Sequence, residues 1–284
     1  MENEELNRQL RKYMEEQNNR PVPDFEGYSP YEMERIFYFP FEDGCPIQLK
    51  RLSESDYKKI PLLNQVKFIA DLIKNSGEIK LTKKGFLPTK IVKEIYNQGF
   101  LKDARLEHFG YKLYKETDSP TIYLSRILLE ISGLTKKRHG KLTLTKKADK
   151  LLSDDEALLK LIFTTFGKRF NWGYFDGYND ENIGRLGFAF SLILIHKYGE
   201  TKRPSSFYAK KYFKAFPMLL KNVVPDYGSI ERYSSRCYSI RTFDRFMDYF
   251  GIIIIEQKDL LADSYIVKSE LFDKLIEVLP HQSQ

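Results

Sequence analysis

The sequence predicts a mainly α-helical protein with small β-hairpins. Apolar residues recur three and four positions apart over much of the 284-residue chain, which is the period of amphipathic helices. A second pattern recurs between these helices: a helix, a short alternating strand, a turn and a second strand. A helix that runs directly into a β-hairpin is typical of a winged helix. We therefore expect tandem winged-helix-like units around a helical middle block.

The first segment, residues 1–60, is predicted to be helical. Apolar residues of 3–18 follow a helical period. A second helix is predicted at Ser29, because serine caps a helix, Pro30 fits the first helical position, and Glu32 can reach back to close a capping box.

Residues 61–152 are predicted to hold two winged-helix-like units. In the first, a helix ends at Gly77 and a short strand leads into another helix near Pro88. In the second, a helix starts at Ser119, and two alternating strands follow it with residues 138–140 as their tip. The tetrapeptide Leu-Thr-Lys-Lys occurs at 81, 134 and 144, and this irregular spacing favours small tandem modules over a solenoid.

Residues 153–228 form the predicted helical middle block. A capping box at Ser153 starts its first helix, and an aromatic, glycine-rich loop anchored by Trp172 follows. Residues 229–284 form the third predicted unit, with a helix that ends at Gly251 and two strands after it.

Two segments resemble an uncharacterised bacterial family with tandem winged-helix-like segments, namely GEIKLTKKGFLPTKIVKEIY and ILLEISGLTKKRHGKLTLTKKADKLL. The N-terminal YSPYEMERIFYFPF is similar to a further segment of that family. The family is similar to regions found beside plasmid-encoded and SEC-C-type modules. The resemblance covers half to two-thirds of the chain. It implies the tandem winged-helix-like architecture, but it implies no activity and no catalytic residues. Ala148 stands where the helix after the second hairpin often has glycine.

The net charge and the number of cysteines indicate which partners and which cellular compartment to expect. The net charge is +7 with a pI near 9.0, which favours polyanionic partners. Residues 197–245 hold 11 basic and 4 acidic side chains, so the excess lies in the second half. Two cysteines make no disulfide framework, and the charged N-terminus is unlike a signal peptide, so we expect a cytoplasmic protein. No apolar run approaches the roughly 20 residues of a membrane span, so no membrane partner is expected.

The leading hypothesis is a non-enzymatic protein that binds nucleic acid, most directly duplex DNA. Lysines and arginines of a wing can displace counterions from phosphates, and arginines four apart share one helix face. The alternative reading is that hairpin lysines only keep an edge strand from pairing with other chains. The predicted nucleic-acid contacts are Lys136, Lys137, Arg138 and Lys141 of the hairpin, and Arg232, Arg236, Arg241 and Arg245 further on.

Two other functions stay open at this point. The first is a protein–protein interaction module with a winged-helix fold, because the first two units look apolar enough to be buried against neighbours. The second, more distant, is a hydrolase that uses Asp176, Asp180 and Glu181 in an acidic loop. The sequence has no metal-ligand spacing, no P-loop and no dinucleotide motif, so we predict no metal, no cofactor and no enzyme activity.

Overall fold

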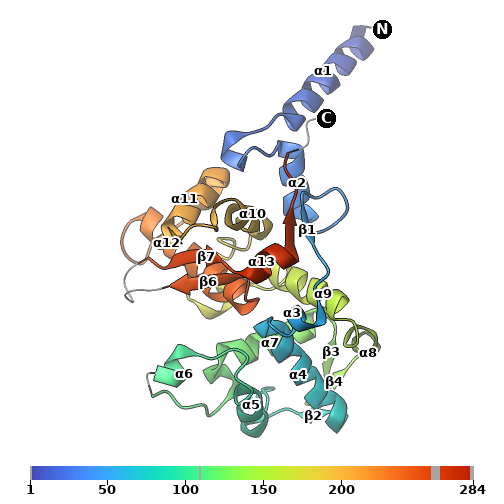
Figure 1. Cartoon of the computed structure of the whole chain (residues 1–284), viewed down its shortest axis with the longest axis vertical. Helices are drawn as coiled ribbons and strands as arrows, with labels where there is room; N and C mark the ends of the chain where they lie inside the picture. Colours follow the sequence, from blue (N-terminus) through green and yellow to red (C-terminus); the bar gives the residue numbers. More distant parts are fainter. Residues whose placement is uncertain (1, 109, 257–262, 282–284) are drawn as a thin grey trace. The chain divides into compact units, whose positions relative to one another are not determined.

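A computed structural model of the chain describes residues 2–108, 110–256 and 263–281 (Figure 1). The chain forms two compact units. Unit 1 consists of residues 1–50, 178–244 and 253–284, and unit 2 of residues 51–177 and 245–252. Both are mainly helical and carry small antiparallel sheets, so the predicted fold class is confirmed.

Unit 2 contains one three-stranded antiparallel sheet, in which β4 lies between β2 and β3. Ile79 of β2 lies opposite Leu142 of β4, and Thr135 of β3 lies opposite Leu144. One sheet therefore joins strands that the sequence analysis assigned to two separate winged-helix-like units. The elements are α3 (Glu54–Tyr57), α4 (Pro61–Ser76), β2 (Ile79–Lys80), α5 (Thr89–Tyr96), α6 (Ala104–His108), η2 (Glu116–Asp118), α7 (Pro120–Ile131), β3 (Thr135–Arg138), β4 (Lys141–Leu144), α8 (Lys146–Leu151), α9 (Asp155–Lys168) and η3 (Trp172–Phe175).

Unit 1 repeats this arrangement with different residues. Its three-stranded antiparallel sheet has the order β5-β7-β6, and β1 pairs with β8 in a second, two-stranded sheet. The elements are α1 (Glu2–Asn19), η1 (Pro23–Phe25), α2 (Pro30–Tyr38), β1 (Ile47–Leu49), α10 (Phe188–Tyr198), β5 (Arg203–Pro204), α11 (Ser205–Ala215), η4 (Pro217–Leu220), α12 (Ile230–Ser239), β6 (Ile253–Glu256), β7 (Tyr265–Lys268), α13 (Glu270–Leu275) and β8 (Ile276–Val278).

The two three-stranded sheets share one chain order. In unit 2 the order is α4, β2, α5, α7, β3, β4, with the short α6 and η2 inserted between α5 and α7. In unit 1 it is α10, β5, α11, α12, β6, β7, with η4 inserted between α11 and α12 and η5 after α12. In each case the last strand lies in the middle of the sheet. In unit 1, α11 packs against α12 and β5, and α10 packs against β7; in unit 2, α4 packs against β4 and α7 against β3 (Figure 1). The η5 segment (Ile240–Met247) continues α12 as a π-helix.

Local signals in the sequence match the structure closely at most helix ends. Ser29 and Glu32 form the predicted capping box, with Glu32 N–H donating to Ser29 Oγ (3.2 Å) and Ser29 N–H donating to Glu32 Oε2 (2.8 Å). At α9 the prediction was off by one residue. The cap is Asp154, whose Oδ1 accepts from Ala157 N–H (3.0 Å), while Ser153 Oγ donates to a carbonyl of the preceding helix.

The β3–β4 hairpin turns through two residues only. His139 and Gly140 have φ of 50° and 70°, and Arg138 pairs with Lys141 across the turn. Such a two-residue turn with both φ values positive twists in the same sense as the strands it joins. The predicted tip of 138–140 is therefore one residue too long, because Arg138 is the last residue of β3.

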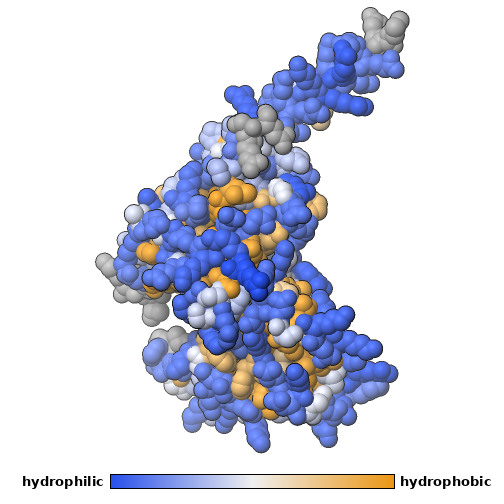
Figure 2. Space-filling view, turned by 45° about the vertical axis from the view of Figure 1, so that its right-hand side comes forward, coloured by the Kyte–Doolittle hydropathy of each residue, from blue (hydrophilic) through white to orange (hydrophobic). Residues whose placement is uncertain are grey.

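Each unit has its own apolar core. In unit 2 a cluster of rings packs around Phe163 and Phe166 of α9, which contact Phe246 and Phe250. In unit 1, the residues of α10 from Phe188 to Ile195 are all buried. Figure 2 shows a mainly hydrophilic surface on the face in view, with hydrophobic residues emerging on both units. Within the described ranges, every helix is too short or too polar to cross a lipid bilayer.

Candidate nucleic-acid interface

The predicted wing of unit 2 presents its cations on the β3–β4 hairpin. Lys136, Lys137 and Arg138 follow one another along β3 and are all exposed. Lys141, the first residue of β4, is also exposed and forms an ion pair with Glu78 (Nζ–Oε1 2.8 Å). Three of the four hairpin cations therefore lie on a single edge strand, because β3 has a neighbour on one side only.

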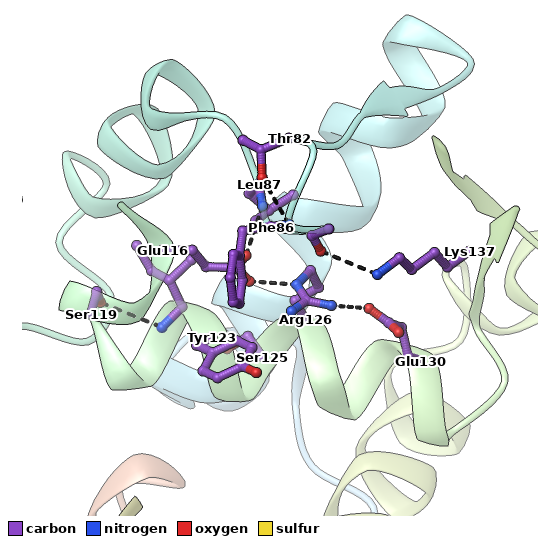
Figure 3. A network of polar contacts seen from close by, with 12 residues as sticks. Thr82, Phe86, Leu87, Glu116, Ser119, Tyr123, Ser125, Arg126, Glu130 and Lys137 are labelled. Atoms are coloured by element: carbon purple, nitrogen blue, oxygen red, sulfur yellow. Dashed lines mark hydrogen bonds and ion pairs between the residues drawn. The ribbon is translucent and has the colours of Figure 1, made fainter. Parts of the chain in front are cut away.

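Beside this hairpin, unit 2 has an open groove of about 420 Å³. One wall comes from α7, and the others from the turn after β2, from β3 and from the segment after α9. Its cations are Lys84, Lys137 and Arg169, and its rings are Phe86, Tyr123, Phe170 and Tyr174. Lys137 reaches across the groove toward the turn, where its Nζ donates to Gly85 O at 3.4 Å (Figure 3).

An ion network holds the wall of this groove (Figure 3). Arg126 on α7 donates through Nε to Glu116 Oε1 (2.5 Å) and through a second guanidinium nitrogen to Glu130. Glu116 is 0% exposed and also accepts from Leu87 N–H at 2.7 Å. The network therefore fixes three segments to one another: the turn after β2, η2 and α7.

Burial dominates the electrostatics of this network. Removal from water raises the pKa of the Glu116 carboxyl, although Arg126 and the Leu87 N–H favour its charged form. Burial lowers the pKa of the Arg126 guanidinium, but its two carboxylate partners outweigh this and raise the pKa overall. Arg126 therefore stays charged, whereas burial favours the neutral form of Glu116.

The exposed face of α12 forms the second cluster, in unit 1. Arg232 is exposed and Arg236 is half-buried, and they lie four residues apart on one face as predicted. Both line a pocket of about 540 Å³ with hydroxyl groups from α11 and α12. Two acids also face this pocket, and the full lining is Ser205, Ser206, Tyr227, Ser229, Glu231, Arg232, Ser235, Arg236, Ser239 and Asp263.

The other two predicted arginines are bound to loops of the protein, Arg241 being buried and Arg245 half-buried. Arg241 is 1% exposed, and its Nη1 donates to Asp180 O (2.6 Å) and Ile183 O (3.1 Å). Both arginines belong to the π-helical segment, whose wider turn moves residues off the face that an α-helix would give them.

Arg245 plays a comparable role in unit 2. It pairs with Asp176 (Nη1–Oδ2 3.1 Å) and donates to the carbonyls of Trp172 and Phe175. Arg241 and Arg245 thus hold loops to a helix, and we leave them out of the candidate surface.

Two carboxylates of the acidic loop at 176–181 are each held by contacts within their own unit. Asp180 Oδ1 accepts from the N–H groups of Asn182 (2.7 Å) and Ile183 (2.8 Å), as in a local turn, while Asp176 pairs with Arg245. Among the residues that the structure describes, no three His, Cys, Asp or Glu side chains are placed to hold a metal ion.

Sequence reasoning missed the aromatic part of the groove and also the position of Arg126. Helical spacing places Tyr123, Arg126 and Glu130 on one face of α7, but Arg126 is 5% exposed because η2 and the turn after β2 cover it. One signal in the sequence did point to the groove. Lys84 and Lys137 are each the fourth residue of a Leu-Thr-Lys-Lys tetrapeptide, and both line it.

Comparison with known proteins gives one match. Residues 58–157, which lie within unit 2, match the family model of the Y4jL N-terminal domain. This range includes α4, the sheet of β2, β3 and β4, and most residues of the groove. No curated protein and no solved structure matches the chain.

Proposed function

We propose that this protein binds nucleic acid without catalysing a reaction, through a winged helix in each unit. The observation that carries the proposal is the chain order shared by the two sheets: helix, strand, helix, helix, strand, strand, with the last strand in the middle. A winged helix requires this order, because the helix before the last two strands is the one that enters the major groove and the hairpin is the wing.

The two units divide the contacts differently. In unit 1 the helix in the groove-reading position is α12, whose exposed Arg232 and half-buried Arg236 suit bidentate contacts to guanine or phosphate. In unit 2 the corresponding helix, α7, is apolar over most of its length, and the cations lie on the wing strand β3. Unit 2 therefore serves to hold the phosphate backbone, and unit 1 to read base edges.

The test is fluorescence anisotropy of the full chain with a labelled duplex at rising salt. We expect binding in the micromolar range, with an affinity that falls steeply with salt concentration. The double variant Lys136→Ala/Arg138→Ala should weaken binding and lower the salt slope by roughly 2, since each lost phosphate contact removes about one unit. The double variant Arg232→Ala/Arg236→Ala should weaken binding and reduce the preference for one duplex sequence over another, since base contacts carry the specificity.

The control variant is Arg11→Ala/Lys12→Ala, which removes the same charge from exposed positions of α1. It should bind as the unchanged protein does. Absence of duplex binding at low salt, or an equal loss for the control and the two test variants, rejects the proposal.

A second candidate is a protein-interaction module, favoured by one surface. Leu6, Leu10, Tyr13 and Met14 are all exposed and recur three and four residues apart along one side of α1. A second copy of the chain is the simplest partner for such a face. Sedimentation velocity tests this: self-association that increases with concentration and disappears in Leu6→Glu/Leu10→Glu supports it, and a monomer at all concentrations rejects it.

A further inference from the structure

The groove of unit 2 combines two features that seldom occur together on a solvated protein surface. Aromatic rings lie in its walls, and Tyr174, the most accessible of them, is 56% exposed. Three exposed cations surround these rings, namely Lys84, Lys137 and Arg169. Rings that stack on bases and cations that bind phosphates are the two elements of a site for single-stranded nucleic acid.

We propose that this groove binds an unpaired nucleotide of a nucleic-acid strand. Its base lies against Tyr174 and Tyr123, its phosphate lies between Lys84 and Lys137, and Asn171 offers an amide to the base edge. This inference rests on the proposed nucleic-acid function, and it adds the kind of nucleic acid that unit 2 recognises. A base inside a duplex has both faces covered by its neighbours, so only an unpaired base can give one face to a ring.

The walls of the groove are held in place before any ligand arrives. The hydroxyls of Tyr123 and Tyr174 are hydrogen-bonded to each other at 2.9 Å. The Tyr123 ring also contacts Phe86 (5.7 Å between centroids), and the Arg126 guanidinium lies 5.1 Å from its centre. The ligand therefore meets rings whose positions are already fixed, which lowers the entropic cost of binding.

The charge of the groove favours an anion. Among the residues that the structure describes, Glu130 is the one acid that lines it, and its carboxylate is paired with Arg126 (Figure 3). The three remaining cations keep a net positive charge. The volume of about 420 Å³ also falls in the range of roughly 300–1,000 Å³ that is usual for small-ligand sites, so one nucleotide fits where a duplex does not.

Gly85 has no side chain, and this leaves the space at the edge of the groove that the Lys137 ammonium group occupies. Its φ is +80°, and a Cβ at this position would stand 2.2 Å from Lys137 Nζ. A side chain at residue 85 would therefore displace this ammonium group as well as strain the turn. The close approach places Lys137 over the same turn that carries Lys84, so the two cations lie near each other.

The experiment uses the full chain with a labelled oligothymidylate of about 10 nucleotides, a length within the usual site sizes. Anisotropy gives the affinity, and Trp172 gives a second readout, because it is the only tryptophan and lies with Tyr174 in η3. We expect Tyr174→Ala to lower the affinity for the single strand about tenfold, by loss of stacking. Tyr174→Phe, which keeps the ring, should retain most of it.

Two comparisons keep the outcome unambiguous. Tyr111→Ala removes a tyrosine of unit 2 that is even more exposed than Tyr174 (65% against 56%) and does not line the groove, and it should leave binding unchanged. The affinity of Tyr174→Ala for a duplex should also be unchanged. An oligothymidylate that does not bind, or that binds Tyr174→Ala as tightly as the unchanged protein, overturns the inference. If the duplex still binds in that case, only the groove assignment fails; if neither ligand binds, the proposed function fails too.

Discussion

The buried ion network of unit 2 predicts a large loss of stability on replacement of Arg126 by methionine. The substitution keeps much of the side-chain volume but leaves Glu116, which is 0% exposed, with Leu87 N–H as its remaining partner in the network. Removal of one partner of a buried pair costs about 3–5 kcal/mol, because the remaining charge is uncompensated. A domain of ordinary stability has about 5–15 kcal/mol in total, so unit 2 should lose about a fifth or more of its free energy of unfolding.

Urea denaturation followed by Trp172 emission measures this loss. Trp172 is the only tryptophan, is buried and belongs to unit 2, so its signal reports the unfolding of that unit. With a urea dependence of about 2 kcal/mol per molar, a loss of 4 kcal/mol moves the midpoint by about 2 M. The double variant Glu116→Gln/Arg126→Met should recover part of the loss, because it removes the stranded charge as well.

The reasoning would be refuted by a loss below about 1 kcal/mol in Arg126→Met, the range of exposed ion pairs. It would also be refuted by a double variant that is less stable than Arg126→Met. Either result would mean that water or another group compensates Glu116 when the arginine is absent.

The same carboxyl gives a pH dependence whose sign is set by burial. Because burial raises the pKa of Glu116 in the folded protein, its contribution to stability is fully present below the unfolded pKa of about 4.3 and is lost as the pH rises through the folded value. The stability of the unchanged protein relative to Glu116→Gln should therefore fall as pH rises through this window. Urea midpoints of both proteins over the acid range test this, and a difference that grows with pH contradicts it.

Three further predictions concern unit 1. Burial alone raises the pKa of Glu26, but hydrogen bonds from Lys197 and Lys211, both 2.7 Å, and from a tyrosine outweigh it and lower the pKa. Glu26→Gln should therefore be less stable at neutral pH in thermal melts, and the difference should shrink as pH falls through the lowered pKa. Arg241→Met should cost roughly 1–3 kcal/mol or more, since two buried carbonyls lose their donor, while the folded fraction keeps its affinity for DNA; a variant with unchanged stability and weaker DNA binding would contradict this. Ser29→Ala should cost about 1 kcal/mol by loss of the capping box, and a denaturant midpoint equal to that of the unchanged protein would show that the cap does not stabilise unit 1.

Features that depend on a few neighbouring residues could be read from the sequence. The capping box at Ser29, the helix ends at Gly77 and Gly133, and the two strands of the β3–β4 hairpin all follow from local chemistry. Pairing between distant strands does not. The contact of Ile79 with Leu142 depends on α5 and α7 folding in between, so the sequence divided one sheet between two expected units.

The burial of charged residues also could not be predicted from local sequence patterns. Spacing places Tyr123, Arg126 and Glu130 on one side of α7, and that placement holds. Whether this side meets water depends on Glu116, which reaches Arg126 from a separate segment. Arg241 was misjudged for a second reason, because the π-helical segment changes the angular position of each residue after Ser239.

The sheet of unit 2 shows where two copies of the repeated Leu-Thr-Lys-Lys tetrapeptide lie. Because β2 and β3 are both antiparallel to β4, which lies between them, they run parallel to each other at the two edges. The copy that starts at Leu81 begins directly after β2, whereas the copy that starts at Leu134 runs into β3. Lys84 lies beyond the end of β2 in the following turn, and Lys137 lies within β3, and the hydrogen bond from Lys137 to Gly85 O joins the two. The repetition thus marks two sides of one groove, and the cations it supplies to the groove belong to one site in unit 2.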